Sequence, residues 1–247
     1  MVAAGAMLLG SPARASDTDD RIESSAKKSY VFKTYLKDDS IKVNSASGAV
    51  TLTGTVAEDS HKSLAENTVA SLPGVTGVDN QLKTKGENPA EHSDAWIGMK
   101  VKSALLFHRD VRATKTDVNV KDGIVTLSGE ASSQAQKELT TEYARDIDHV
   151  KEVKNDMTVA KTAQPAETIG EKIDDASITA QVKSSLMSHR STSAVKTKVA
   201  TVDGVVTVSG IAKNDAEKTL VTKLVTNING VTSVINNMTI AAPVAAN

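Results

Sequence analysis

Apolar and polar residues alternate in three short segments, each of which begins and ends with glycine. The segments are Gly48–Gly54, Gly123–Gly129 and Gly204–Gly210. In the first, Val50 and Leu52 alternate with threonines, and the other two follow the same pattern. A period of two predicts a β-strand with one buried and one solvent-facing side. The flanking glycines permit the turns at both ends of that strand.

Two further strands are predicted around each of these segments. A shorter alternating segment comes before it, and in the second and third copies an Asp-Gly pair joins the two, which is a strong signal for a β-hairpin. A last strand is predicted at residues 78–84, 153–159 and 234–240. An asparagine recurs at its third position, as Asn80, Asn155 and Asn236. We interpret these asparagines as structural, satisfying backbone groups at a turn or sheet edge.

Two amphipathic helices are predicted for each copy. The first precedes the hairpin, and its apolar residues step by four, as Ile97, Val101 and Leu105 and again as Ile178, Val182 and Leu186. The second follows the hairpin and carries Leu64, Leu139 or Leu220 on its apolar side. Such spacing puts the apolar residues on one helical face. In the first copy the first helix covers about residues 22–36, and its connection to the next strand is expected to be about five residues shorter.

The same register in all three copies identifies an internal repeat. Each copy is predicted as helix–strand–strand–helix–strand, and two helices on the apolar face of a three-stranded sheet form a two-layer α/β sandwich. The expected fold class is therefore α+β, with three tandem small sandwiches, each holding its own small aliphatic core. The predicted boundaries are residues 17–85, 94–161 and 173–241, followed by a tail at 242–247.

This combination of features resembles the BON domain family. The resemblance rests on the glycine-bounded strand, on the helix start Ser133-Gln134-Ala135-Gln136, and on the ending from Gly230-Val231 through Asn236 and Met238. It implies a location in the periplasm or cell envelope and a non-enzymatic role. It also implies weak, peripheral binding to phospholipid surfaces or other envelope components, with a contribution to osmotic or envelope stress protection. The family brings no established catalytic residues.

The N-terminus carries an uncharged apolar run at residues 2–10, followed by Ala13-Arg14-Ala15. This triplet fits the small-x-small rule of a signal peptidase site, so residues 1–15 are interpreted as a signal peptide remnant and the protein as exported to the periplasm. The alternative is a disordered alanine-rich terminus. The chain has no cysteine, which is compatible with an oxidising compartment.

Charge and residue content argue against several functions. The chain has 29 Lys and Arg against 30 Asp and Glu, whereas nucleic-acid binders carry a net basic surface. Residues 17–85 hold 9 basic and 10 acidic residues, residues 94–161 hold 11 and 11, and residues 171–241 hold 8 and 6, which gives −1, 0 and +2. No two of the five histidines are three or four residues apart, so no helical metal pair is expected. We predict no metal, no cofactor and no catalytic site.

Two features are candidate contacts with anionic lipid. His108-Arg109 and His189-Arg190 occupy equivalent places, 15 residues before a hairpin glycine (123 − 108 and 204 − 189). They fit either head-group contact or capping of a helix C-terminus. Trp96, with Lys100 four residues later on the same helical face, fits either an interfacial anchor or packing at the core edge.

A second class of function remains open on the sequence. The Thr- and Ser-rich faces of the sheets could meet an extended polypeptide, as in a periplasmic chaperone-like or protein-interaction module. An enzyme is the third class, and no residue set supplies a nucleophile, a base and oxyanion donors. The oligomeric state is not predicted.

Overall fold

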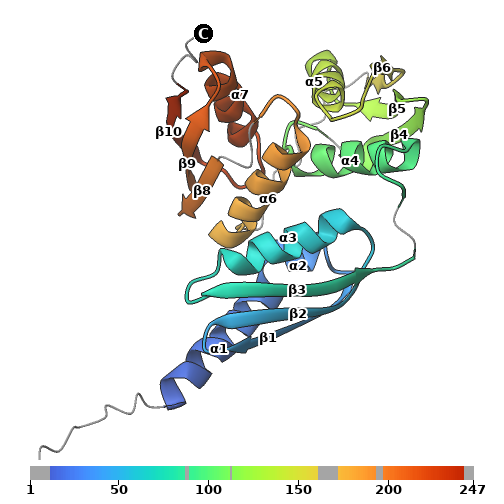
Figure 1. Ribbon diagram of the computed structural model, residues 1–247. Coiled ribbons are helices and arrows are strands. Elements are labelled where there is room, and N and C mark those ends of the chain that lie inside the picture. The colour runs from blue at the N-terminus through green and yellow to red at the C-terminus, as the bar shows by residue number, and fades with distance from the viewer. Residues whose placement is uncertain (1–11, 87–88, 112, 161–171, 193–196, 242–247) are drawn as a thin grey trace, which may run out of the picture.

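The computed structural model describes residues 12–86, 89–111, 113–160, 172–192 and 197–241. These residues form three successive units, here called unit 1 (12–86), unit 2 (89–160) and unit 3 (172–241), which pack against one another (Figure 1). Residues 1–11 of the predicted signal remnant and the predicted tail at 242–247 lie outside the described residues. No helix in the described part of the chain is long and apolar enough to span a membrane.

Each unit has the predicted order of helices and strands. Unit 1 contains α1 (Pro12–Lys28), α2 (Tyr30–Thr34), β1 (Ser40–Ala46), β2 (Ala49–Val56), α3 (Asp59–Ala70) and β3 (Gly77–Thr84). Unit 2 contains α4 (Asp94–Phe107), the short 3₁₀ turn η1 (Ala113–Lys115), β4 (Thr116–Lys121), β5 (Ile124–Ala131), α5 (Gln134–Arg145), β6 (Glu152–Asn155) and β7 (Thr158–Val159). Unit 3 contains α6 (Asp175–Ser188), β8 (Thr197–Val202), β9 (Val205–Ala212), α7 (Asp215–Thr226) and β10 (Ser233–Ile240).

The three sheets share one topology. The middle strand pairs antiparallel with the strand before it and parallel with the strand after it, so β2, β5 and β9 are central. Unit 2 differs from the prediction of one continuous last strand at 153–159, because β6 and β7 pair separately with β5. The fold class predicted from the sequence, α+β with three tandem α/β units, is confirmed.

Backbone conformation explains the recurring glycines. Asp122 and Gly123 have φ of 54° and 79°, the two positive values of a type I′ hairpin turn. Gly129 lies within β5, paired with Thr116, and not at a turn as predicted. Its φ is 114°, and a Cβ atom there would lie 2.1 Å from the carbonyl oxygen of Lys115. Only a residue without a side chain fits both constraints.

An aspartate joins the first helix of every unit to its hairpin. The carboxylate of Asp94 accepts hydrogen bonds from the backbone N–H groups of Asp122 and Gly123, at 2.7 and 2.8 Å. Asp19 and Asp175 make the same pair of bonds, and in all three units the glycine is 29 residues after the aspartate. The connection from the helix to the hairpin is shorter in unit 1, as predicted, but by three residues and not five, since it covers 35–39 in unit 1 and 108–115 in unit 2. The first helix of unit 1 is also interrupted at Ser29, which is the N-cap of α2.

The recurring asparagine joins the last strand to the second helix. In unit 3 the Asn236 side chain donates to the carbonyl oxygen of Lys218 and to the hydroxyl of Thr222, and it accepts from the backbone N–H of Met238, at 2.8 to 3.0 Å. The equivalent bonds hold Asn80 and Asn155. These bonds give the asparagine a structural role.

The core differs from the three separate cores that the sequence led us to expect. Buried apolar residues form one contiguous cluster through all three units, because α6 is buried nearly all round. Its apolar residues Ile178 and Val182 are buried, and so are its polar residues Ser177 and Gln181. Two backbone N–H groups of α2 donate to Asp174 and Ser177 at 2.7 and 3.0 Å. Unit 1 is thus docked on the first helix of unit 3.

Candidate functional site

Units 2 and 3 meet through their two His-Arg pairs, related by an approximate twofold symmetry. His108 is the C-cap of α4 and His189 the C-cap of α6. The backbone N–H of Arg109 donates to the carbonyl of Asn227 in unit 3, at 2.9 Å. The backbone N–H of Arg190 donates to Asp146 in unit 2, at 3.0 Å. The C-terminus of α4 therefore contacts the C-terminus of α7, and the C-terminus of α6 contacts that of α5.

The two histidines are buried in this interface, with exposed fractions of 1% and 2%. Their ring centroids are 5.8 Å apart, and the ring of His108 stacks on Tyr143 at 3.9 Å with an interplanar angle of 10°. Lipid contact through these two side chains, expected as one of two interpretations, does not fit this position. Their place at the helix C-termini agrees with the capping interpretation.

The arginines satisfy the carbonyl ends of the opposing second helix. The Arg109 guanidinium donates to the carbonyl oxygens of Thr226 and Val231. The Arg190 guanidinium donates to those of Arg145 and Val150. A cation favours the partial negative charge of a helix C-terminus. The sequence missed this role because the carbonyls belong to another unit.

Electrostatics keep His108 neutral. Burial, and then the nearby His189, lower the pKa of His108 from 6.5 to about 3. Its Nε2 lies 3.4 Å from the Ser185 hydroxyl. His189 lies on Asp146, at 3.1 Å from Nδ1 to Oδ2. Burial alone would raise the pKa of Asp146, but hydrogen bonds from His189 and Ser191 lower it overall.

This cluster does not assemble a hydrolytic triad. Asp146 orients His189, but the His189 Nε2 has no hydrogen-bond partner among the described residues. Ser185 contacts His108 instead, whose Nδ1 also lacks a partner in the described part of the chain. A nucleophile and an oriented base must share one imidazole, and here they lie on different rings.

A groove of about 620 Å³ opens beside this interface. It lies between α5 and α7, with Leu139 and Tyr143 on one side and Leu220 and Leu224 on the other. His189 is also part of its lining. This groove could not be predicted from the sequence, because its walls come from different copies of the repeat.

Trp96 lies in a separate aromatic cluster on unit 2. The Trp96 ring is half-buried, and the Lys100 ammonium lies 5.0 Å from its centroid. The exposed rings of His92 and His149 lie 5.3 and 5.8 Å from it, and 3.8 Å from each other. Both interpretations of Trp96 fit in part, since the ring touches the core and also reaches the surface. In the described residues no group of three or more potential ligands could hold a metal ion.

The outer face of the third sheet is the most distinctive exposed surface. On the side away from α6 and α7 it presents the residues here called the open face of unit 3: Lys198, Ala200, Val202, Val205, Thr207, Ser209, Ile211, Ser233, Ile235, Asn237 and Thr239. Val202, Ile211 and Ile235 are 68%, 49% and 47% exposed. No helix covers this side of the sheet in Figure 1.

Equivalent positions in the other two sheets are polar or small, with the exception of Ile124 at the position of Val205. The position of Ile235 is occupied by Asp79 in unit 1 and Lys154 in unit 2, as the strand registers show. The positions equivalent to Val202 and Ile211 are occupied in unit 2 by Lys121 and Glu130. The open face of unit 3 contains no carboxylate. Comparison of the three copies at these alternate positions is the sequence signal that would have found it.

Comparison with known proteins agrees with the repeat. The family model of the BON domain matches residues 18–86, 93–161 and 174–242. The chain is 30% identical over 200 residues to "Osmotically-inducible protein Y" of Escherichia coli (strain K12), covering 80% of this chain and 96% of that protein. It is 34% identical over 116 residues to a "21 kDa hemolysin" of Actinobacillus pleuropneumoniae, covering 46% of this chain and 59% of that protein.

Solved structures add little beyond this. A structure of CdsD, a structural protein of the type III secretion system of Chlamydia trachomatis, covers 91% of this chain and 92% of its own, at 16% identity and a TM-score of 0.23. That score is too low for any argument. The three family matches and the three sheets of one topology show that the chain belongs to the BON domain family, with three copies of the domain.

Proposed function

We propose that this protein is a non-enzymatic, exported BON-repeat protein that binds the anionic phospholipid surface of the envelope peripherally and contributes to protection against osmotic or envelope stress. The similarity to an osmotically inducible protein over 80% of the chain supports the stress role. The apolar run and the Ala-Arg-Ala triplet at the N-terminus support a periplasmic location.

The observation that carries the lipid-binding proposal is the open face of unit 3. Exposed valine and isoleucine side chains gain free energy when they leave water. The face carries Lys198 and no carboxylate, so an anionic surface attracts it and nothing on it repels that surface. One lysine contributes about 1 kcal/mol near such a surface, which makes binding weak and reversible.

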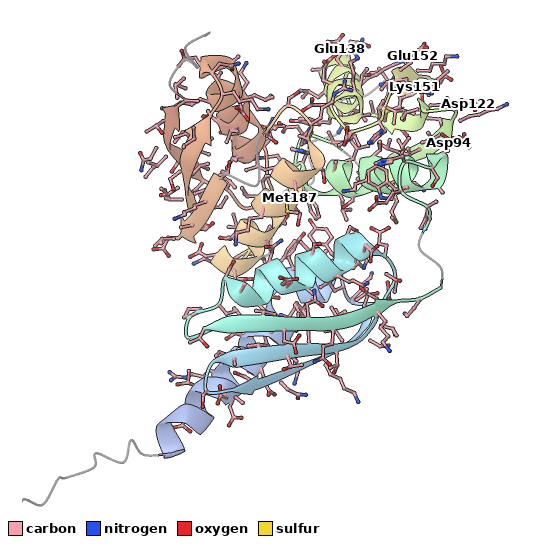
Figure 2. All side chains as sticks on the ribbon, in the orientation of Figure 1. Asp94, Asp122, Glu138, Lys151, Glu152 and Met187 are labelled. Carbon is pink, nitrogen blue, oxygen red and sulfur yellow. The ribbon has the colours of Figure 1, made fainter. Side chains whose placement is uncertain are left out.

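Trp96 and Lys100 are a second, separate contact. Asp94, which Figure 2 labels, begins α4 on the side of unit 2 away from the third sheet. Trp96 and Lys100 belong to this helix and not to the open face of unit 3. An amphipathic ring beside a lysine suits a head-group layer. We assign it a secondary role, because acidic Asp148 lies next to His149 in the same cluster.

Flotation with vesicles tests the proposal. The intact chain is mixed with vesicles of phosphatidylglycerol and phosphatidylethanolamine, or with neutral phosphatidylcholine vesicles, at low and moderate salt. We expect co-flotation with the anionic vesicles at low salt and a clear loss at moderate salt, because screening weakens the charge term. Absence of the protein from the vesicle fraction under every condition overturns it. Suppression of client aggregation without any vesicle binding would favour a chaperone-like module.

A further inference from the structure

The groove between α5 and α7 has no role in the proposed function. Its walls are built from equivalent positions of two repeats, with Leu139 and Tyr143 on α5 and Leu220 and Leu224 on α7. Figure 1 shows both helices at the same end of the molecule, away from unit 1. Ligand sites in proteins occupy about 300–1,000 Å³ and are mostly apolar with a few polar groups. At about 620 Å³ this groove falls inside that range.

The polar groups of the lining are mostly satisfied within the protein. The hydroxyl of Tyr143 accepts a hydrogen bond from Asn227 at 2.7 Å. Glu142 pairs with Arg145, and Asp146 is held by His189 and Arg190. The two acids of the lining are therefore both neutralised.

Lys223 is a cation of the lining that forms no ion pair with a described residue. The equivalent position in unit 2 is occupied by Glu142, which pairs with Arg145. With Arg145, Arg190 and Lys223 against Glu142 and Asp146, the lining carries 3 − 2 = +1 charge. The floor adds the buried Nε2 of His189, which has no partner in the part of the chain that the structure describes. The groove thus has an apolar lining with a net positive charge.

We propose that this groove binds a single-chain anionic amphiphile, such as a fatty acid or a lysophospholipid. The alkyl chain would lie between Leu139, Leu220 and Leu224, and the anionic head would pair with Lys223 at the rim. Each methylene removed from water contributes about 0.8 kcal/mol, or about a fourfold gain in affinity. This proposal is independent of the open face of unit 3, which belongs to the other side of that unit.

Calorimetric titration of the intact chain tests the proposal, with monomeric decanoate, decyl phosphate and uncharged decanol as probes. We expect decanoate and decyl phosphate to bind more tightly than decanol, and octanoate to bind more weakly than decanoate. Preference for decyl phosphate would favour a phospholipid source, and preference for decanoate a fatty acid. No saturable binding of any probe up to millimolar concentration overturns the proposal.

Two variants separate the head-group and chain contacts. Lys223→Glu is expected to weaken decanoate binding about tenfold, close to 1.4 kcal/mol, and to leave decanol within twofold. Leu220→Gln, at a half-buried position, should weaken all probes. The matched control is Lys102→Glu, an exposed lysine on α4 outside the groove, which should change nothing. Equal losses from Lys223→Glu and Lys102→Glu would contradict the assigned head-group contact. Circular dichroism and thermal melting establish that each variant is folded.

Discussion

The imidazole rings of His108 and His189 lie 5.8 Å apart in a T-shaped arrangement inside the interface between units 2 and 3. Each ring ends the first helix of its own unit. The His108 ring stacks on Tyr143 of α5, and the His189 ring contacts Asp146 at the end of the same helix. The repeat thus places a histidine at the end of the first helix in both unit 2 and unit 3, and the packing of these units brings the two histidines together. Neither ring faces solvent, and the lowered pKa of His108 makes the interface sensitive to protonation.

The first prediction concerns acid. The folded chain holds His108 neutral with a pKa of about 3, whereas the unfolded chain takes up that proton near 6.5. The unfolded state therefore binds more protons between these values, and the free energy of unfolding falls as the pH falls through that window. The lowered pKa of Asp146 acts in the same direction at lower pH. We expect a loss of up to about 1.4 kcal/mol per pH unit, measured by urea unfolding.

Replacing the titrating ring tests this directly. His108→Phe keeps the stacking on Tyr143 but removes the proton site, so its stability should vary less between about pH 7 and pH 5. His92→Phe, at an exposed histidine, is the control and should keep the wild-type slope. Equal slopes for His108→Phe and the wild type would show that His108 is not the acid-sensitive group.

The second prediction contrasts two glycines of unit 2. Gly129→Ala forces a side chain into a left-handed backbone and against the Lys115 carbonyl, so it should cost about 2–4 kcal/mol. Gly98 lies inside α4, and a Cβ there meets only the Val120 side chain at 3.4 Å. Gly98→Ala should therefore stabilise the protein by up to about 1 kcal/mol. Similar melting temperatures for the two variants would refute this account of the glycine pattern.

The third prediction concerns the aspartate that joins helix and hairpin. Asp94→Ala removes two charge-assisted hydrogen bonds to the Asp122–Gly123 turn, at a cost of about 2–3 kcal/mol. Asp117→Ala, at an exposed carboxylate on β4, should change stability by less than about 0.5 kcal/mol. Chemical denaturation of both variants is the measurement. A loss as large for Asp117→Ala would show that charge, and not these two bonds, is the cause.

Local pattern predicted the units well, because strand alternation, the Asp-Gly turns and the helical stripes are short-range signals that tertiary packing here reinforces. The contacts between units could not be predicted in this way. A sequence gives the apolar stripe of α6, but nothing in it says that Ser177 and Gln181 are also buried by unit 1. Likewise His92 and His149 become neighbours only through the fold.

Two features were within reach of the sequence but needed a comparison of the repeats. The constant spacing of 29 residues between Asp19, Asp94 and Asp175 and their hairpin glycines aligns the first helix of unit 1 without a gap. The apolar substitutions on one side of the third sheet, such as Ile235 where unit 2 has Lys154, mark the open face.

The most direct test of lipid binding through unit 3 uses the absence of cysteine from the chain. A single cysteine, labelled with an environment-sensitive fluorophore, is placed at three equivalent outward positions by Asp79→Cys, Lys154→Cys and Ile235→Cys. Addition of phosphatidylglycerol vesicles should shift the emission to the blue for Ile235→Cys alone, since only that face would enter the head-group layer. An unshifted emission for Ile235→Cys while the protein still floats with the vesicles, or equal shifts at all three positions, would contradict the assignment of the open face.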